Sequence, residues 1–143
     1  MTAAAGYSGT PLAQKLGLKD GQRVLFIDLP PSLDELRTAR QFRQAAEGEW
    51  DTWQDGEPGY DLIHGFTASR QVLEDNAGPL RDSIARDGTI WVSWPKKASK
   101  VPTDITEDVI REVVLPIGLV DVKVAAVDAV WSGLKLVIRK ELR

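Results

Sequence analysis

The residues of this sequence that could carry chemistry are few, and the densest group of them is basic. Lys96, Lys97 and Lys100 fall within five residues and directly follow the apolar segment TIWVSW (89–94). Three ammonium groups on one loop attract a phosphate or carboxylate, and Trp94 beside them offers a flat ring for stacking. The loop is therefore interpreted either as an anion site or as a solvated basic loop without a ligand.

His64 is the single histidine and lies within the apolar segment YDLIHGF (60–66). Alternation along a strand puts it on the same face as Leu62 and Phe66. There it is either a hydrogen-bonded core residue or a general base. As a base it needs a carboxylate partner, for which Asp28 is the candidate. A Ser/His/Asp arrangement using Ser93 lacks the G-x-S-x-G sequence that positions a nucleophile.

Composition excludes several classes of site. The chain of 143 residues contains no cysteine and one histidine. This excludes a disulfide scaffold, a cysteine-based zinc site, an iron–sulfur cluster, a thiol nucleophile and a multi-histidine metal site, so we predict no metal. The net charge of −3 disfavours a nucleic-acid partner.

The beginning of the sequence predicts a compartment. The first twenty residues lack a basic start followed by an apolar run, so we expect no signal peptide. No stretch approaches the roughly 18 apolar residues that a membrane span needs. We therefore expect a cytoplasmic protein without a membrane partner.

The elements that must position these residues alternate between helix and strand. In the first half, Thr10 with Pro11 predicts the start of a short helix that Gly17 ends. Ser32 with Glu35 forms a capping box that predicts a helix through Ala46. The strands predicted in this half are RVLFIDL (23–29), a weak candidate at 50–53, and YDLIHGF (60–66).

The second half continues this alternation. Apolar residues at helical spacing over 72–84 predict a helical segment, which Gly78-Pro79 should divide into two short helices. Asp104 with Glu107 predicts a capped helix that ends at Pro116 and Gly118. The remaining predicted strands are 89–94, 120–128 and 134–140, of which the last two form a hairpin.

These elements predict a three-layer, Rossmann-like α/β fold with a mostly parallel sheet of about six strands that ends in an antiparallel hairpin. We expect an N-terminal segment with a short helix over 1–19 and a single domain over 20–143. Ligands of such sheets bind beyond the carboxyl ends of the strands. The residues predicted there to bind a ligand are Asp28, Ser32, Thr67, Ser93, Trp94, Lys96 and Lys97.

The order of elements resembles the C-terminal two-thirds of a class I methyltransferase. Residues 60–94 are similar to its stretch from the fourth to the fifth strand, and residues 118–140 to its final hairpin. The whole chain also resembles a family of small bacterial proteins with this type of fold. That resemblance rests on GYSGTPLAQKLG, WVSWPKKAS, TDITEDVIRE and VDAVWSGLKLVIRKEL. It implies a methyltransferase-like fold and no particular activity.

One departure from the methyltransferases concerns their cofactor. Those enzymes hold S-adenosylmethionine on a glycine-rich loop after the first strand and on an acidic residue at the end of the second. Here the segment after the first strand is Asp28-Leu29-Pro30-Pro31-Ser32, whose prolines lack N–H donors. Asp51 is the candidate for the acidic residue at the end of the second strand. We predict no cofactor, with S-adenosylmethionine as the alternative. No G-x-G-x-x-G motif supports a nicotinamide cofactor.

Three functional hypotheses follow. The first is a non-catalytic methyltransferase-like module that binds a small anionic ligand or a protein partner. The second is an enzyme, either of methyltransferase type or an acid/base enzyme using Asp28 and His64 at the carboxyl edge of the sheet. The third, disfavoured by the net charge, is a nucleic-acid protein using the lysine loop and Trp94. Trp131, in the hairpin connection, covers the sheet edge or meets a second subunit, which leaves a homo-oligomer open.

Overall fold

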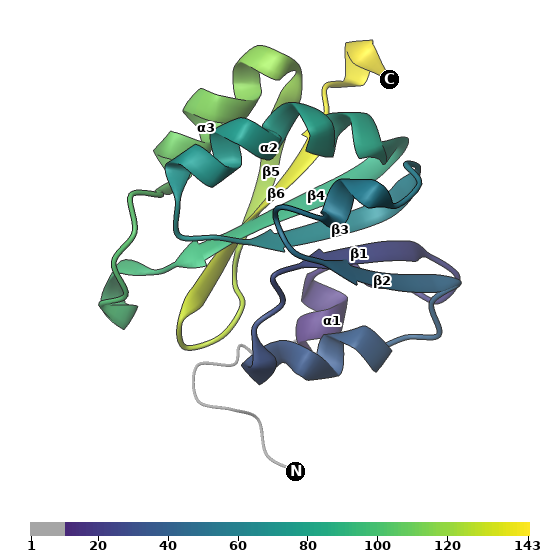
Figure 1. The fold of residues 1–143 in the computed structure, drawn as a ribbon, viewed down its shortest axis with the longest axis horizontal. Coiled ribbons are helices and arrows are strands. Elements are labelled where there is room, and N and C mark those ends of the chain that lie inside the picture. Colours follow the sequence, from purple (N-terminus) through teal and green to yellow (C-terminus); the bar gives the residue numbers. More distant parts are fainter. Residues whose placement is uncertain (1–10) are drawn as a thin grey trace.

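Six strands form one mixed sheet in the order β2-β1-β3-β4-β6-β5 (Figure 1). The computed structural model describes residues 11–143. The strands are β1 (Arg23–Ile27), β2 (Gln44–Gly48), β3 (Tyr60–Phe66), β4 (Ile84–Pro95), β5 (Leu119–Ala126) and β6 (Trp131–Ile138). β1 to β4 pair in parallel, whereas β6 runs antiparallel to both β4 and β5. The predicted fold class, with its antiparallel hairpin, is confirmed.

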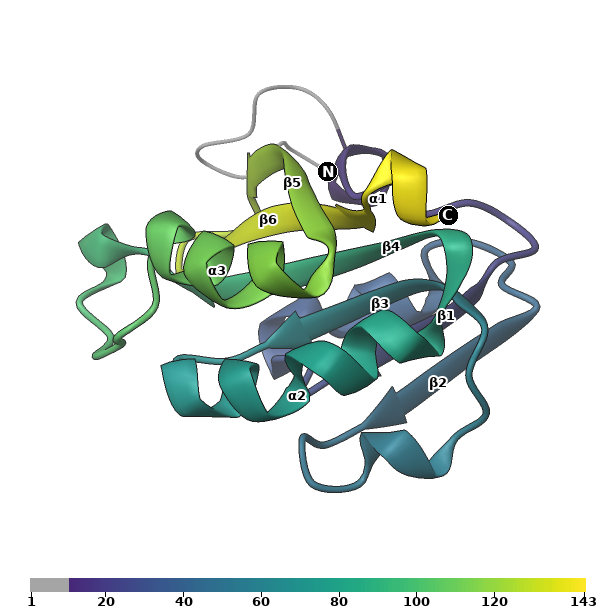
Figure 2. The ribbon, with the colours of Figure 1, turned by 90° about the horizontal axis from the view of Figure 1, so that it is seen from above.

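Helices cover both faces of the sheet. α2 (Arg70–Ser83) and α3 (Glu107–Val114) lie on one face, and α1 (Leu12–Lys15) and the 3-10 helix Pro31–Thr38 lie on the other (Figures 1 and 2). Alternation along β4 sends its two tryptophans to different cores. Trp91 packs on the α1 side, and Trp94 packs on the side of α2 and α3.

The segment after β1 differs from the predicted helix over 32–46. Pro30 precedes the 3-10 helix, which ends at Thr38, and Ser32 donates its hydroxyl to Asp128 instead of capping a helix. Residues 44–48 extend beside β1, with Arg23 paired to Gln44. The capping-box prediction is therefore wrong, because pairing with a buried strand outweighs the local helix signal.

The predicted strand at Trp50–Trp53 is also wrong, because β2 already occupies the edge beside β1. The backbone N–H groups of Thr52 and Trp53 both donate to the carbonyl of Glu49, which closes a turn. A 3-10 helix, Trp53–Asp55, follows this turn. The second strand is thus the polar segment before the tryptophans.

The later helices refine the predictions. α2 runs unbroken through Pro79, so the predicted division at Gly78-Pro79 is wrong. Thr106, not Asp104, caps α3 by accepting a hydrogen bond from the N–H of Val109 at 3.1 Å. Asp104 instead accepts a hydrogen bond from the N–H of Arg70 at the start of α2.

Two glycines end helical segments as predicted. Gly17 and Gly118 have φ angles of +76° and +92°, which a side chain would resist. The predicted cap Thr10 lies outside the described residues. Over residues 11–143, none of the helices has the length and apolar character needed to cross a bilayer.

Candidate functional site

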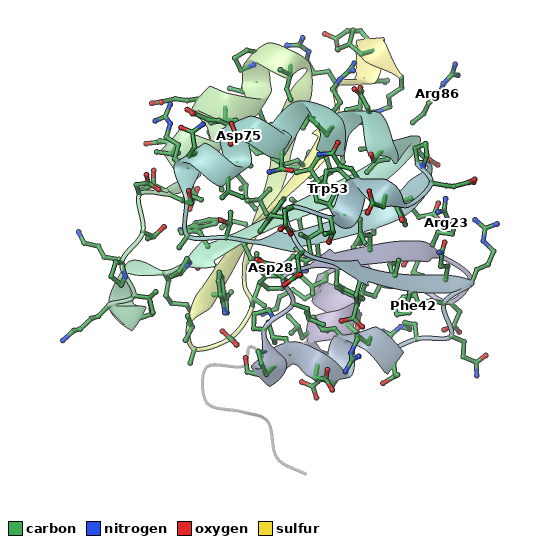
Figure 3. The ribbon with its side chains drawn as sticks, viewed as in Figure 1. Arg23, Asp28, Phe42, Trp53, Asp75 and Arg86 are labelled. Carbon is green, nitrogen blue, oxygen red and sulfur yellow. The ribbon has the colours of Figure 1, made fainter. Side chains whose placement is uncertain are left out.

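The strand order reverses between β1 and β3, which is where open α/β sheets bind ligands. We call the space beyond the ends of these two strands the switch-point crevice. Asp28 follows β1 directly, and Figure 3 places it at the end of that strand, opposite Arg23 at its start. Its φ of 55° is left-handed, and its N–H donates to the carbonyl of Gly48 at 2.9 Å. The chain after β1 is therefore turned toward β2.

Trp50 fills one side of this crevice. Its indole nitrogen donates to the carbonyl of Phe66, the last residue of β3, at 2.8 Å. Its ring lies on Gly65, where an added Cβ would be 2.5 Å from the nearest ring carbon. The side chain that follows β2 thus reaches across β1 to β3. This contact is not predicted above, and its one signal in the sequence is the glycine inside the apolar strand, Gly65.

Trp53 anchors the same segment to α2. It is buried on the α2 side of the sheet, and its indole nitrogen donates to Oδ1 of Asn76 in α2 at 2.8 Å (Figure 3). The amide of Asn76 in turn donates to the carbonyl of Val72. The connection between β2 and β3 is therefore fixed by two indole hydrogen bonds.

The carboxyl of Asp28 is surrounded by other acids. Partial burial and then the carboxylate of Glu49 raise its pKa, the backbone N–H of Trp50 opposes them by a hydrogen bond, and Asp51 raises the pKa further. Asp51, the candidate for binding a ribose, is exposed. This end of the crevice repels anions.

His64 and Ser93 form a buried pair inside the sheet. His64 Nε2 lies 2.7 Å from the Ser93 hydroxyl, and both residues are fully buried. Burial lowers the pKa of His64 to about 3. The predicted partnership of His64 with Asp28 is wrong, since Ser93 takes that place. Among the described residues, no group bonds to Nδ1 of His64.

The predicted ligand-binding residues are only partly brought together, because the N–H of Thr67 donates to the carbonyl of Ser93 at 3.0 Å while the others lie apart from this pair. Ser93 lies in the core, Asp28 and Ser32 are exposed near the end of β1, and Thr67 is buried after β3. The Thr67 hydroxyl accepts a hydrogen bond from the N–H of Ser69, so it serves the start of α2. Only Trp94 and Lys97 of the predicted set meet at a hollow.

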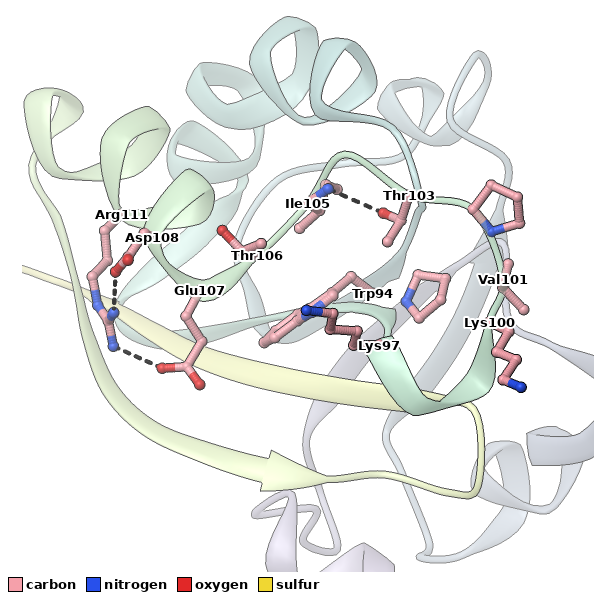
Figure 4. A pocket seen from close by; sticks show the side chains of 12 residues that line it. Trp94, Lys97, Lys100, Val101, Thr103, Ile105, Thr106, Glu107, Asp108 and Arg111 are labelled. Atoms are coloured by element: carbon pink, nitrogen blue, oxygen red, sulfur yellow. Dashed lines mark hydrogen bonds and ion pairs between the residues drawn. The ribbon is translucent and has the colours of Figure 1, made fainter.

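That hollow lies between the end of β4, the loop after it and the beginning of α3 (Figure 4). We call it the Trp94 hollow, and its volume is about 720 Å³. It is lined by Trp94, Pro95, Lys97, Lys100, Val101, Pro102, Thr103, Ile105, Thr106, Glu107, Asp108 and Arg111. Lys96 does not line it, because Lys96 precedes the turn that carries the other two lysines.

Trp94 and two lysines supply unused donors to this hollow. The indole groups of Trp50, Trp53 and Trp91 each donate to an acceptor within the protein. Trp94 is only 7% exposed as a residue, and its indole N–H makes no hydrogen bond to residues 11–143; the nitrogen itself is not among the buried unpaired atoms, so it meets solvent. The same residues provide no ion-pair partner for Lys97. These groups can bind an anion.

The opposite wall carries a dense ion-pair network. The guanidinium of Arg111 contacts Glu107 at 3.0 Å, Asp108 at 2.9 Å and Asp121 at 3.0 Å. These contacts use three of its five N–H groups, one on each nitrogen, so Arg111 is held mainly by the protein's own carboxylates. Within residues 11–143, no three histidines or carboxylates are placed to hold a metal ion.

Comparison with known proteins places the fold. No family model and no curated protein matches the sequence. A solved S-adenosylmethionine-dependent methyltransferase from Aquifex aeolicus is similar, with a TM-score of 0.67 and 14% identity over 89% of this chain and 87% of that one. The ribosomal protein L11 methylase from Lactobacillus delbrueckii subsp. bulgaricus gives 0.58 and 13%, over 90% and 75%.

A TehB-like methyltransferase from Corynebacterium glutamicum is also similar, with a TM-score of 0.56 and 14% identity over 94% and 91% of the two chains. The chain therefore has a class I methyltransferase-like fold, as its resemblance implies. Identities this low show the fold and leave the activity open.

Proposed function

We propose that this protein is a non-catalytic, methyltransferase-like module that binds a small anionic ligand in the Trp94 hollow. The observation that carries the proposal is the hollow itself, in which Trp94, whose indole N–H makes no hydrogen bond to the described residues and meets solvent, lies beside Lys97 and Lys100. An anion bound beside the two lysines can also accept a hydrogen bond from that N–H.

The switch-point crevice does not fit the S-adenosylmethionine on which the similar enzymes depend. Pro30 and Pro31 remove the N–H donors that a loop at this position would offer, and the indole of Trp50 lies across the crevice. Glu49 and Asp51 add negative charge beside Asp28. These features support a module without that cofactor.

The acid/base alternative is also poorly supported. His64 is buried and bonded to Ser93, while Asp28 is exposed at the end of β1. A general base must reach the proton that it removes, and a buried imidazole with a pKa of about 3 is a weak base at neutral pH. The binding hypothesis needs neither residue.

A thermal-shift experiment tests the proposal with inorganic phosphate, 4-methylbenzoate and S-adenosylhomocysteine as probes. A ligand at about 100 times its dissociation constant adds roughly 2.7 kcal/mol to stability and raises Tm by several degrees. We expect a shift with an anionic probe that Lys97→Ala/Lys100→Ala abolishes and that Lys19→Ala/Lys140→Ala, a matched pair outside the hollow, retains.

Two results would overturn the proposal. A shift with S-adenosylhomocysteine alone would move the site to the switch-point crevice and favour a methyltransferase. Retention of anion binding in the Lys97/Lys100 variant would place the ligand elsewhere.

A further inference from the structure

The two walls of the Trp94 hollow carry opposite charge. Lys97 and Lys100 stand on the loop wall, and their ammonium groups have no carboxylate partner within the described chain. On the helix wall, the guanidinium of Arg111 contacts Glu107 and Asp108, and it also reaches Asp121 of β5 outside the hollow, so three carboxylates surround one cation. Figure 4 shows Glu107, Asp108 and Arg111 on one side of Trp94 and Lys100 on the other, with Lys97 drawn next to the indole.

The surface between the two walls is largely apolar. Trp94 forms the floor, and Val101, Pro102 and Ile105 contribute aliphatic surface along the loop. Val101 is 42% exposed. A ligand that spans the hollow therefore meets a cationic end, an apolar middle and an anionic end.

An anion alone would leave the helix wall unmatched. One guanidinium stands against three carboxylates, and those of Glu107 and Asp108 are 42% and 86% exposed, so the helix wall presents accessible negative charge. Arg111 contacts one carboxylate oxygen of Glu107, Oε2. The other, Oε1, makes no hydrogen bond to the described residues and is the natural acceptor for a second cation.

We propose that the ligand of the Trp94 hollow is a dipolar small molecule, whose carboxylate or phosphate binds Lys97 and Lys100 and whose ammonium binds Glu107, with an apolar body against Trp94. This inference rests on the proposed function and specifies its ligand class. The charges must be separated by the apolar body, because the two walls lie on either side of the indole.

Three probes that share one ring separate the charges of such a ligand. They are 4-(aminomethyl)benzoate, which carries both charges, 4-methylbenzoate, which keeps the carboxylate, and 4-methylbenzylamine, which keeps the ammonium. We measure their dissociation constants by titration calorimetry at low salt. The dipolar probe is expected to bind about tenfold more tightly than either singly charged probe, the size expected for one charge-assisted hydrogen bond.

Variants assign each end of the probe. Glu107→Gln should reduce the advantage of the dipolar probe over 4-methylbenzoate to about twofold or less, while 4-methylbenzoate itself binds as before. Glu112→Gln, on the same helix but paired with Arg70 outside the hollow, is the matched control and should keep the full advantage. Thermal melts of both variants report whether they remain folded.

The outcomes separate this inference from the proposed function. If 4-methylbenzoate binds as tightly as the dipolar probe, the anion site stands and the dipolar ligand is refuted. If Glu112→Gln loses the advantage as Glu107→Gln does, the ammonium does not bind at Glu107. If no probe binds, both proposals fail.

Discussion

The indole nitrogen of Trp50 lies 2.8 Å from the carbonyl oxygen of Phe66, so a side chain that follows β2 is bonded to the end of β3. The strand between them is β1, over whose end the indole must pass. The indole of Trp50 thus covers one side of the point where open α/β sheets bind ligands.

Gly65→Ala tests this contact. The new Cβ would lie 2.5 Å and 2.7 Å from two ring carbons of Trp50, so the indole must leave and lose its hydrogen bond. We expect a loss of about 2–3 kcal/mol in the free energy of unfolding, measured with urea.

Gly78→Ala is the control for that substitution. An added Cβ at Gly78 meets no atom within 4 Å. We expect a change below about 1 kcal/mol, because the gain in helix propensity is offset by crowding against Pro79. Equal effects at the two glycines would mean that Trp50 does not cover this side of the crevice.

His64 makes stability depend on pH. Its pKa is about 3 in the folded protein against an ordinary value of 6.5, because burial disfavours the charged imidazole. Below pH 6.5 the unfolded chain binds a proton that the folded chain does not, so acid lowers stability. The slope from this group is about 1.4 kcal/mol per pH unit down to about pH 3.

Unfolding free energies of the wild type and His64→Leu between pH 7 and pH 4 measure this effect. The unfolding free energies of the two proteins should converge as the pH falls. Only the wild type loses stability through protonation of His64 on unfolding, whereas the carboxylates are the same in both proteins. Parallel curves would show that His64 titrates normally in the folded protein.

Asn76→Ala removes the acceptor of a buried indole N–H. Asn76 lies 2.8 Å from Nε1 of Trp53, and its own amide donates to Val72. We expect a loss of about 2 kcal/mol, since an unpaired buried donor costs more than the bond contributes. Combined with Trp53→Phe, the losses should be less than additive, and strict additivity would argue against the bond.

Thr106→Ala removes the N-terminal cap of α3. The hydroxyl of Thr106 accepts a hydrogen bond from the backbone N–H of Val109. A loss of about 1 kcal/mol in the free energy of unfolding is expected. Because Thr106 also lines the Trp94 hollow, the variant should be compared in the absence of any probe. A change near zero would mean that the hydroxyl does not cap the helix in solution.

The sequence predicts the buried part of this fold well and the sheet edge poorly. β1, β3 and β4 are apolar runs covered on both faces, so local composition identifies them. β2 is QAAEG, a half-exposed edge strand whose extended state depends on pairing with β1. No local pattern records that pairing, and the preceding capping box favoured a helix instead.

Some residues of the candidate site could likewise be predicted from the sequence, and others could not. The end of β4 and the lysines after it are adjacent in sequence, so Trp94 and Lys97 were predictable together. Ser93, one residue earlier, was misplaced at the edge because its burial follows from the full width of the sheet. The helix wall with Arg111 was missed, since only the folded loop brings it opposite the lysines.

The position of β6 between β4 and β5 has a consequence for folding. β6 is the last of the six strands along the chain, yet it is inserted inside the sheet. Until it pairs, the long strand β4 presents a row of open backbone groups and apolar side chains to other molecules. During synthesis on the ribosome this edge of β4 therefore stays open until residues 131–138 have been made and can pair with it.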